Sequence, residues 1–185
     1  MGSMAVYVIG LGSNLGARYA TLADAAARLD RAPGCRVIAC SRVYESAPLG
    51  PVAQPHFLNA AALVASALDP EPMLSELLAI EAVLGRVRDV RWGPRTIDLD
   101  LLWGPRPVAS ARLTLPHPGL SQRWFALAPL LDAVRAALAG ELPEPERAPL
   151  HALAATAEAQ LAALGGVPAG TKSAAFGAES ASVYT

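Results

Sequence analysis

One stretch decides both the fold and the chemistry, and it reads Arg91-Trp92-Gly93-Pro94-Arg95-Thr96-Ile97-Asp98-Leu99-Asp100-Leu101-Leu102. The second half is typical of a β-strand, in which successive side chains point to opposite faces. Ile97, Leu99 and Leu101 then share an apolar face. Asp98 and Asp100 share the opposite face, with their Cα atoms roughly 7 Å apart. The pattern predicts a strand that carries a pair of carboxylates beside a core.

A pair of acidic side chains has no structural use in such a strand, because buried carboxylates without partners are costly and repel each other. Two Mg²⁺ ions carrying a nucleotide's phosphates would remove both problems, since Mg²⁺ prefers a few carboxylates with phosphate oxygens and water. Arginine suits forked contacts with phosphate. Four arginines precede the acidic pair: Arg86, Arg88, Arg91 and Arg95. The alternative is an edge strand with a solvated acidic face, but the arginines and the Trp-Gly-Pro sequence favour a phosphate site.

Length and charge narrow the class of protein. The chain has 185 residues and a formal net charge of −1, which argues against general binding to nucleic acid or to an anionic membrane. No apolar run has the length of a membrane span and no signal peptide is evident, so we expect a cytoplasmic protein. We expect one domain over residues 4–164 and a disordered, dispensable segment over 165–185. Residues 1–3 are typical of a cloning addition.

Periodicity and turn residues outline the other elements. We expect strands over residues 5–11, 35–45 and 57–68, a short hairpin partner over 106–115, and helices over 17–31, 72–84, 125–137 and 150–164. The alanines of 57–68 would also suit a helix, but Pro-rich loops bound this segment at strand length. Pro129 should interrupt its helix early. The β-α-β-β-α-β order predicts an α+β fold, with an antiparallel sheet and helices on one face.

Two loops could bring a ligand close to the backbone. The sequence from Gly10 to Gly16 superficially matches a dinucleotide-binding fingerprint, but its spacing is off by one and the elements do not alternate as a parallel sheet requires. A tight turn that a substrate can approach is the better explanation. Residues 48–51 could be only a stiff connection. Behind them, Phe57 and Asn59 share a strand face and could offer a flat heterocycle a stacking surface and paired polar groups.

The histidines and cysteines are less informative. His117 is locked between two prolines, so we expect an exposed turn in which it contacts phosphate. We expect His56 and His151 to be surface residues. Cys35 and Cys40 are too few and too ordinarily spaced for a metal or redox motif, which favours two buried free thiols.

Several of these motifs, in this order, resemble the 6-hydroxymethyl-7,8-dihydropterin pyrophosphokinase family of folate biosynthesis. They extend from Val6 to about Leu131 and include Gly12-Ser13-Asn14-Leu15, Pro48-Leu49-Gly50-Pro51, Phe57-Leu58-Asn59-Ala60, Gly85-Arg86-Val87-Arg88, the stretch from Arg91 to Asp100, and Pro116-His117-Pro118 with Arg123 and Phe125. The resemblance implies a ferredoxin-like antiparallel sheet with packed helices and C-terminal additions. It also implies a monomer that transfers the terminal pyrophosphate of ATP to the pterin hydroxymethyl group.

The resemblance assigns roles to individual residues. Asp98 and Asp100 would hold two Mg²⁺ ions, and Arg86 and Arg95 would be catalytic residues that steady the transferred phosphates. The nucleotide would contact Arg88, Arg91, Trp92, Arg95, Arg112, Thr114, His117 and Arg123. The pterin would lie between the aromatic rings of two phenylalanines, and its contacts would be Gly12, Ser46, Ala47, Leu49, Phe57, Asn59, Trp92 and Phe125.

Two features depart from the family pattern. The loop between Val87 and Trp92 is one residue shorter, so no equivalent of the family's loop lysine can be assigned. The segment after about Leu150 carries no family role. Two other functions stay open at this point: a binding module that holds a metal-nucleotide without turning it over, and a kinase that moves only the γ-phosphoryl group. No Ser-His-Asp or Cys-His arrangement suggests covalent catalysis.

Overall fold

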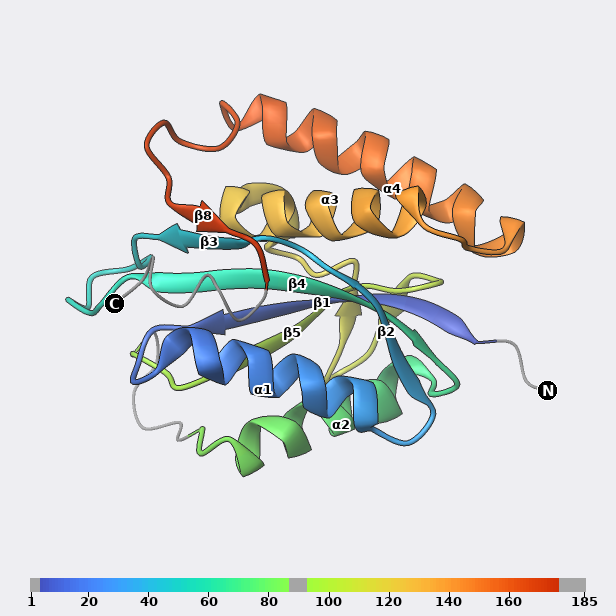
Figure 1. The fold of residues 1–185 in the computed structure, drawn as a ribbon, viewed down its shortest axis with the longest axis horizontal. Coiled ribbons are helices and arrows are strands. Elements are labelled where there is room, and N and C mark those ends of the chain that lie inside the picture. Colours follow the sequence, from blue (N-terminus) through green and yellow to red (C-terminus); the bar gives the residue numbers. More distant parts are fainter. Residues whose placement is uncertain (1–3, 87–92, 177–185) are drawn as a thin grey trace.

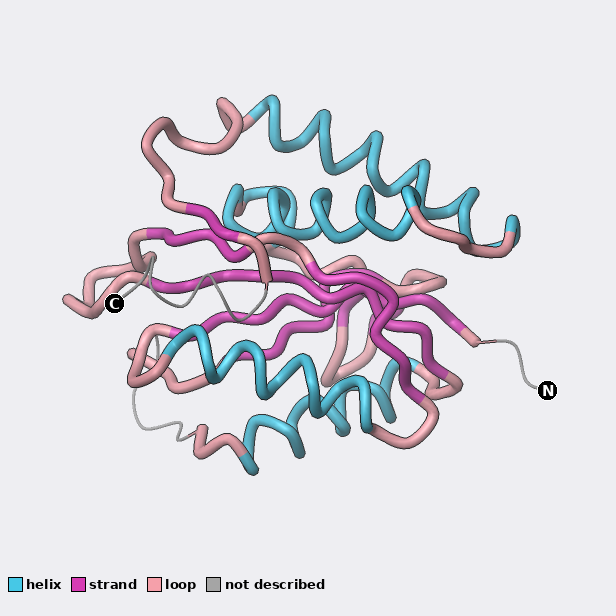
Figure 2. The backbone as a smooth tube through the Cα atoms, viewed as in Figure 1, coloured by secondary structure: helices cyan, strands magenta, loops and turns pink. Residues whose placement is uncertain are grey.

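The computed structural model of the protein describes residues 4–86 and 93–176, and it has a central antiparallel sheet between two layers of helices (Figure 1). Helices α1 (Arg18–Arg31) and α2 (Pro70–Val83) cover one face. Helices α3 (Trp124–Ala139) and α4 (Glu144–Ala163) cover the other (Figure 2). The expected α+β class is confirmed. The expected one-sided helix layer is corrected, because the sheet presents apolar side chains on both faces.

The sheet is built around two long strands, β1 (Ala5–Ser13) and β4 (Phe57–Ser66), which pair with each other from Ala5 and Ser66 to Ser13 and Leu58. Strand β5 (Asp98–Trp103) lies on the other side of β1, and β2 (Cys35–Cys40) and β3 (Val43–Ser46) both pair with β4. The single strand expected over 35–45 is therefore split in two. At the break, the Ser41 hydroxyl accepts a hydrogen bond from the Ala61 amide at 2.8 Å, which replaces a ladder partner.

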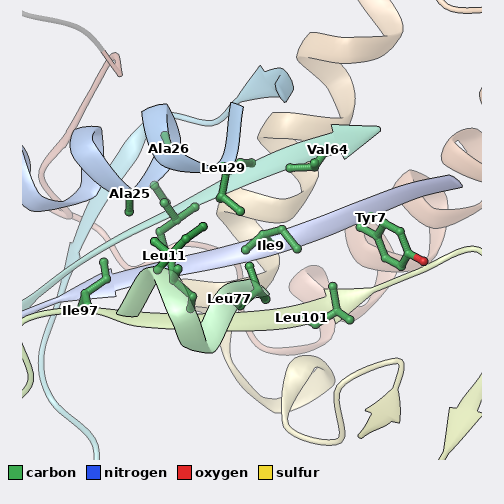
Figure 3. Packing of buried hydrophobic residues seen from close by; sticks show 14 of the residues in the cluster. Tyr7, Ile9, Leu11, Ala25, Ala26, Leu29, Val64, Leu77, Ile97 and Leu101 are labelled. Carbon is green, nitrogen blue, oxygen red and sulfur yellow. The ribbon is translucent and has the colours of Figure 1, made fainter. Parts of the chain in front are cut away.

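Strand alternation divides the interior into two cores, one on each face of the sheet. In β1, Tyr7, Ile9 and Leu11 face α1 and α2 (Figure 3). Val6 and Val8 face α3 and α4. The helix expected over 17–31 is confirmed as α1, and its buried residues are Leu22, Ala25, Ala26 and Leu29. The expected strand over 57–68 is also confirmed as β4.

Helices α3 and α4 each tolerate an internal proline. Pro129 lies six residues into α3 and does not interrupt it, because the helix loses a single backbone donor there while the proline ring is buried. Helix α4 begins six residues before the expected Leu150 and includes Pro149. Within the described residues, no helix combines the length and the apolar composition needed to cross a lipid bilayer.

Short elements complete the fold. Strands β6 (Val108–Ala109) and β7 (Thr114–Leu115) pair only with each other, so the expected hairpin over 106–115 forms a small sheet of its own. A 3₁₀ turn, η1 (Leu120–Gln122), precedes α3. Strand β8 (Ser173–Ala174) adds to the outer edge of β3. The structure thus differs from the expected disorder of 165–185 as far as Phe176, and the rest of that segment lies outside the described residues.

Candidate active site

A pocket opens on the face of the sheet that α3 covers, at the N-terminal end of that helix. The sheet supplies its floor, and the loop after β3, the η1 turn and the start of α3 supply its walls. Of the residues assigned from the sequence, the lining contains Gly12, Ser46, Ala47, Leu49, Phe57, Asn59, Arg95, Asp98, Asp100, His117, Arg123 and Phe125. The structure therefore brings together residues from six separate segments of the chain.

Asp98 lies at one edge of the pocket floor between two arginines. Arg86 Nη1 contacts Asp98 Oδ1 at 2.7 Å, and Arg95 Nη1 donates a hydrogen bond to Asp98 Oδ2 at 2.6 Å. All three side chains are mostly shielded from solvent, with exposed fractions of 11% for Arg86, 25% for Arg95 and 20% for Asp98. Because each arginine uses a different carboxylate oxygen, the group is fixed in orientation as well as in charge.

Asp100 lies two residues further along the same face of β5, as the sequence predicts. Burial raises the pKa of its carboxyl above the ordinary value, and the negative charge of Asp98 raises the pKa further. Positive charge from His117, Arg123 and Arg86 opposes this shift. Two nearby carboxylates, one of them desolvated, carry negative charge that favours the binding of a cation.

Glu81 is a buried acid that was not predicted from the sequence as part of the site. It lies in α2, only 2% of its surface is exposed, and its carboxylate forms an ion pair with Arg86. Glu81 Oε1 also accepts a hydrogen bond from the Leu99 amide at 2.7 Å. Burial raises the pKa of the Glu81 carboxyl, although the Leu99 amide and Arg86 favour its charged form. A signal was present, since Glu81 follows Met73 and Leu77 at four-residue spacing on the buried stripe of its helix.

Asn14, in the motif Gly12-Ser13-Asn14-Leu15, is a second residue whose role was not predicted from the sequence. It is 1% exposed, and its Oδ1 accepts a hydrogen bond from the Arg95 amide at 2.8 Å. Its Nδ2 donates to Gln54 Oε1 at 2.9 Å and to the Pro55 carbonyl at 3.1 Å. One side chain thus joins the end of β1 to the arginine loop and to the loop before β4.

The opposite half of the pocket carries aromatic and amide groups. Phe57 and Asn59 come from the same face of β4, and Phe125 comes from the first turn of α3. Asn59 Nδ2 donates a hydrogen bond to Ser46 Oγ at 2.9 Å, which fixes the orientation of the amide. A Cβ atom at Gly12 would lie 3.7–3.9 Å from Asp98, Asn59 and Phe57, so a side chain there would fill the floor of the pocket.

His117 and Arg123 close the side of the pocket next to Asp100. The His117 amide donates to the Leu102 carbonyl at 2.9 Å, and the Gly119 amide donates to His117 Nδ1 at 3.1 Å. In the neutral ring the proton therefore lies on Nε2. The expected exposed turn is corrected in one respect, because His117 is half-buried. A Cβ at Gly119 would lie 2.9 Å from Arg123 Cζ, so a side chain there would displace the Arg123 guanidinium.

Other sequence-assigned residues lie outside this lining. Arg112 is beside Glu71 with 3.7 Å between Nη1 and Oε2, and Thr114 lies in β7. Arg86 reaches the site through its contact with Asp98 rather than by lining the pocket. Arg88, Arg91 and Trp92 lie outside the described residues.

The fold and the pocket define an α+β protein with a paired-aspartate, arginine-rich site beside an aromatic pocket. Residues 8–135 match the family described as 7,8-dihydro-6-hydroxymethylpterin-pyrophosphokinase (HPPK), and the chain belongs to that family. The resemblance inferred from the sequence is thereby confirmed.

Individual relatives agree with this assignment. The chain is 50% identical over 94 residues to a 2-amino-4-hydroxy-6-hydroxymethyldihydropteridine pyrophosphokinase of Methylorubrum extorquens, a match that covers 51% of this chain and 60% of the relative. It is 48% identical over 97 residues to the protein of that name from Pseudomonas aeruginosa, covering 52% of this chain and 59% of the relative. The matches therefore span about three-fifths of the length of these relatives.

Solved structures support the fold. A crystal structure of Plasmodium falciparum HPPK-DHPS with SDX-DHP has a TM-score of 0.58 at 14% identity, with 93% of this chain and 48% of that chain covered. A structure described as HPPK-DHPS in complex with substrates has a TM-score of 0.61 at 13% identity, with 92% and 46% covered. At these identities the likeness establishes the arrangement of elements alone.

Proposed function

We propose that this protein transfers pyrophosphate from Mg-ATP to the hydroxymethyl group of 6-hydroxymethyl-7,8-dihydropterin and releases AMP. The observation that carries the proposal is the pocket itself, in which Asp98 and Asp100 lie on the same floor as Phe57 and Asn59. A metal-bound phosphate chain and a flat heterocycle can thus meet in one cavity. Family membership supports the same activity.

The acidic pair fits Mg²⁺. Within residues 4–86 and 93–176, no three His, Cys, Asp or Glu side chains are grouped to hold a metal by themselves. Two carboxylates are enough for Mg²⁺ that binds together with a nucleotide, because phosphate oxygens and water complete its coordination. Asp98 and Asp100 would hold the two ions, which would neutralise phosphate charge when bound. The arginine contacts of Asp98 leave lone pairs on each of its oxygens for a metal.

The arginines supply the remaining positive charge. In the proposed reaction the pterin hydroxyl oxygen bonds to the β-phosphorus, the bond from that phosphorus to the α,β-bridging oxygen breaks, and the hydroxyl proton is lost. Negative charge builds on the bridging oxygen and on the transferred group. Arg86 and Arg95 would stabilise that charge, a role supported by the contacts that already hold both guanidinium groups beside Asp98. We assign further nucleotide contacts to His117 and Arg123 from the pocket lining.

The aromatic half of the pocket would hold the pterin. Phe57 and Phe125 would stack on its two faces, while Asn59 and the loop after Ser46 would bind its polar edge. The Asn59–Ser46 hydrogen bond fixes the amide before any substrate arrives, which lowers the entropy cost of binding. For Arg88, Arg91, Trp92, Arg112 and Thr114, a nucleotide or pterin role rests on the family resemblance alone.

The products distinguish this reaction from its two rivals. The protein is incubated with Mg-ATP and 6-hydroxymethyl-7,8-dihydropterin, and nucleotides and pterins are separated chromatographically. We expect AMP and pterin diphosphate in equal amounts, and no AMP when the pterin is omitted. ADP as the stoichiometric product would identify a γ-phosphoryl kinase. Unchanged ATP with a folded protein would identify a binding module, and either result overturns the proposal.

A further inference from the structure

The C-terminal residues 171–176 lie along the outer edge of the sheet, well beyond the family-matched residues 8–135 (Figure 1). Ala174 pairs with Val43 and Ser173 pairs with Tyr44, and the Glu45 amide donates to the Lys172 carbonyl at 3.0 Å. The segment therefore satisfies backbone groups of β3 that would otherwise form an open sheet edge.

Side chains fix the same segment to α1. Tyr19 of α1 donates its hydroxyl to the Ala175 carbonyl at 3.1 Å, and its ring lies 6.0 Å from that of Phe176. Phe176 also packs against the core under α1 and α2. On the other side, Arg42 Nη2 donates to the Ser173 carbonyl at 3.2 Å. Residues 171–176 thus link α1 to β3.

These two elements hold the loop that closes the aromatic side of the pocket. Ser46, the last residue of β3, is the hydrogen-bond partner of Asn59. Arg18, the first residue of α1, contacts Glu45 Oε1 at 3.2 Å and donates to the His56 carbonyl at 2.7 Å. The segment therefore pairs with the strand that leads into the 47–56 loop, and it contacts Tyr19, the neighbour of the Arg18 that holds the far end of the loop.

We propose that residues 171–176 are a positioning element for the heterocycle-binding half of the pocket, an inference that rests on the proposed function. By fixing β3 and α1, the segment keeps the 47–56 loop in the shape that binds the flat ring. The strand order β5-β1-β4-β3-β8 puts three strands between the segment and the carboxylates of β5. Its loss should therefore weaken pterin binding selectively and leave nucleotide binding unchanged. This reverses the dispensability that the small, polar composition suggested.

Two truncations form a matched pair. One chain ends at Gly170 and loses the segment, and the other ends at Phe176 and keeps it. We expect the first to raise the KM for the pterin about tenfold, because fewer molecules hold the loop in its binding-competent shape. The KM for ATP should not change, and the chain ending at Phe176 should match the full chain. Phe176→Ala in the full chain should shift the pterin KM in the same direction, with Val167→Ala as its control.

Hydrogen exchange and pterin titration give readouts that do not require turnover. We expect faster amide exchange over residues 45–57 in the chain ending at Gly170, with β5 unchanged, and weaker pterin binding. Equal effects on both substrates, or a lowered melting temperature with both KM values unchanged, would reduce the segment to a purely structural role and overturn the inference. A full chain that makes no AMP would sink the proposed function instead, and exchange and titration would still decide the positioning role. If the chain ending at Gly170 does not fold, Phe176→Ala decides.

Discussion

The Glu81 carboxylate accepts a hydrogen bond from the Leu99 amide at 2.7 Å, and Leu99 is the residue between the two aspartates of β5. The same carboxylate forms an ion pair with Arg86, which also contacts Asp98. One buried acid on α2 therefore fixes both the backbone that carries the acidic pair and one of the arginines that balance its charge. The helices on one face of the sheet set the geometry of a site on the other.

Substitutions of Glu81 should therefore distinguish its effect on turnover from its effect on stability. Glu81→Gln keeps an acceptor for the Leu99 amide but loses the charge that holds Arg86, so we expect a lower kcat with a small change in stability. Glu81→Ala also leaves the buried amide unpaired, which should cost about 1–3 kcal/mol of unfolding free energy. Urea unfolding and steady-state kinetics measure the two quantities. Glu158→Ala, an exposed acid paired with Arg135, is the control and should change neither. Equal loss of stability in both Glu81 variants would contradict the division of roles.

Replacing either aspartate of β5 by asparagine should abolish Mg²⁺-dependent turnover. Asp98→Asn and Asp100→Asn keep the shape of the side chain while removing the negative charge that a metal requires. The fold should survive, because both side chains face the pocket rather than the core. Product formation at saturating Mg²⁺ and circular dichroism are the measurements. Asp24→Asn, in an exposed ion pair of α1, should keep full activity. Near-normal turnover in a folded Asp98 or Asp100 variant would remove the acidic pair from the mechanism.

Arg86 and Arg95 should act mainly on the transition state. Loss of a charge-stabilising group of this kind costs on the order of 10² or more in rate, so alanine at either position should lower kcat by at least that factor. ATP affinity, measured by calorimetry, should fall much less. Arg106→Ala tests the general effect of removing an arginine, since Arg106 is exposed and pairs with Asp69. If the Arg86 or Arg95 variant keeps full turnover at saturating substrate, that arginine contributes only to ground-state binding.

Cys40 should be slow to react at ordinary pH. Burial raises the pKa of its thiol from 9.0 to about 11, so at pH 8 only about one molecule in a thousand carries the thiolate. The folded state holds this proton more tightly than the unfolded state, so the resulting stabilisation is complete below about pH 9 and is lost as pH rises toward 11. In a Cys35→Ser background, iodoacetamide should modify the folded protein about tenfold faster for each pH unit up to about pH 10. Folded and urea-unfolded protein reacting equally fast at pH 8 would contradict the raised pKa.

The sequence predicted the elements whose residues are decided locally. Alternation in β5 and the helix over 17–31 both follow from chain periodicity, and both are confirmed. Pro129 was expected to interrupt a helix, but tertiary burial of the proline outweighs the loss of one backbone hydrogen bond. The docking of residues 171–176 was not predicted, because its stability comes from Tyr19 and β3, more than a hundred residues away along the chain.

In the site too, some residues could be predicted from the local sequence and others could not. Asp98, Asp100, Phe57 and Asn59 could be assigned because their residue types and spacing already suggest a metal-phosphate site and a stacking site. Glu81 could not be distinguished by type, since a glutamate in a helix is ordinarily solvated, and only its position on the buried stripe set it apart. Residues that act by holding other residues in place are difficult to recognise from a single sequence.

The core between the sheet and helices α3 and α4 determines where this protein can be truncated for expression. The family-matched region ends at residue 135, inside α3, yet Leu150, Leu153 and Ala157 of α4 pack over the buried face of that helix. A fragment that stops where similarity stops would present the leucines of α3 to water, and such exposed apolar surface promotes aggregation. Expression boundaries for this protein should follow its packing, with α4 retained, rather than the extent of its resemblance to relatives.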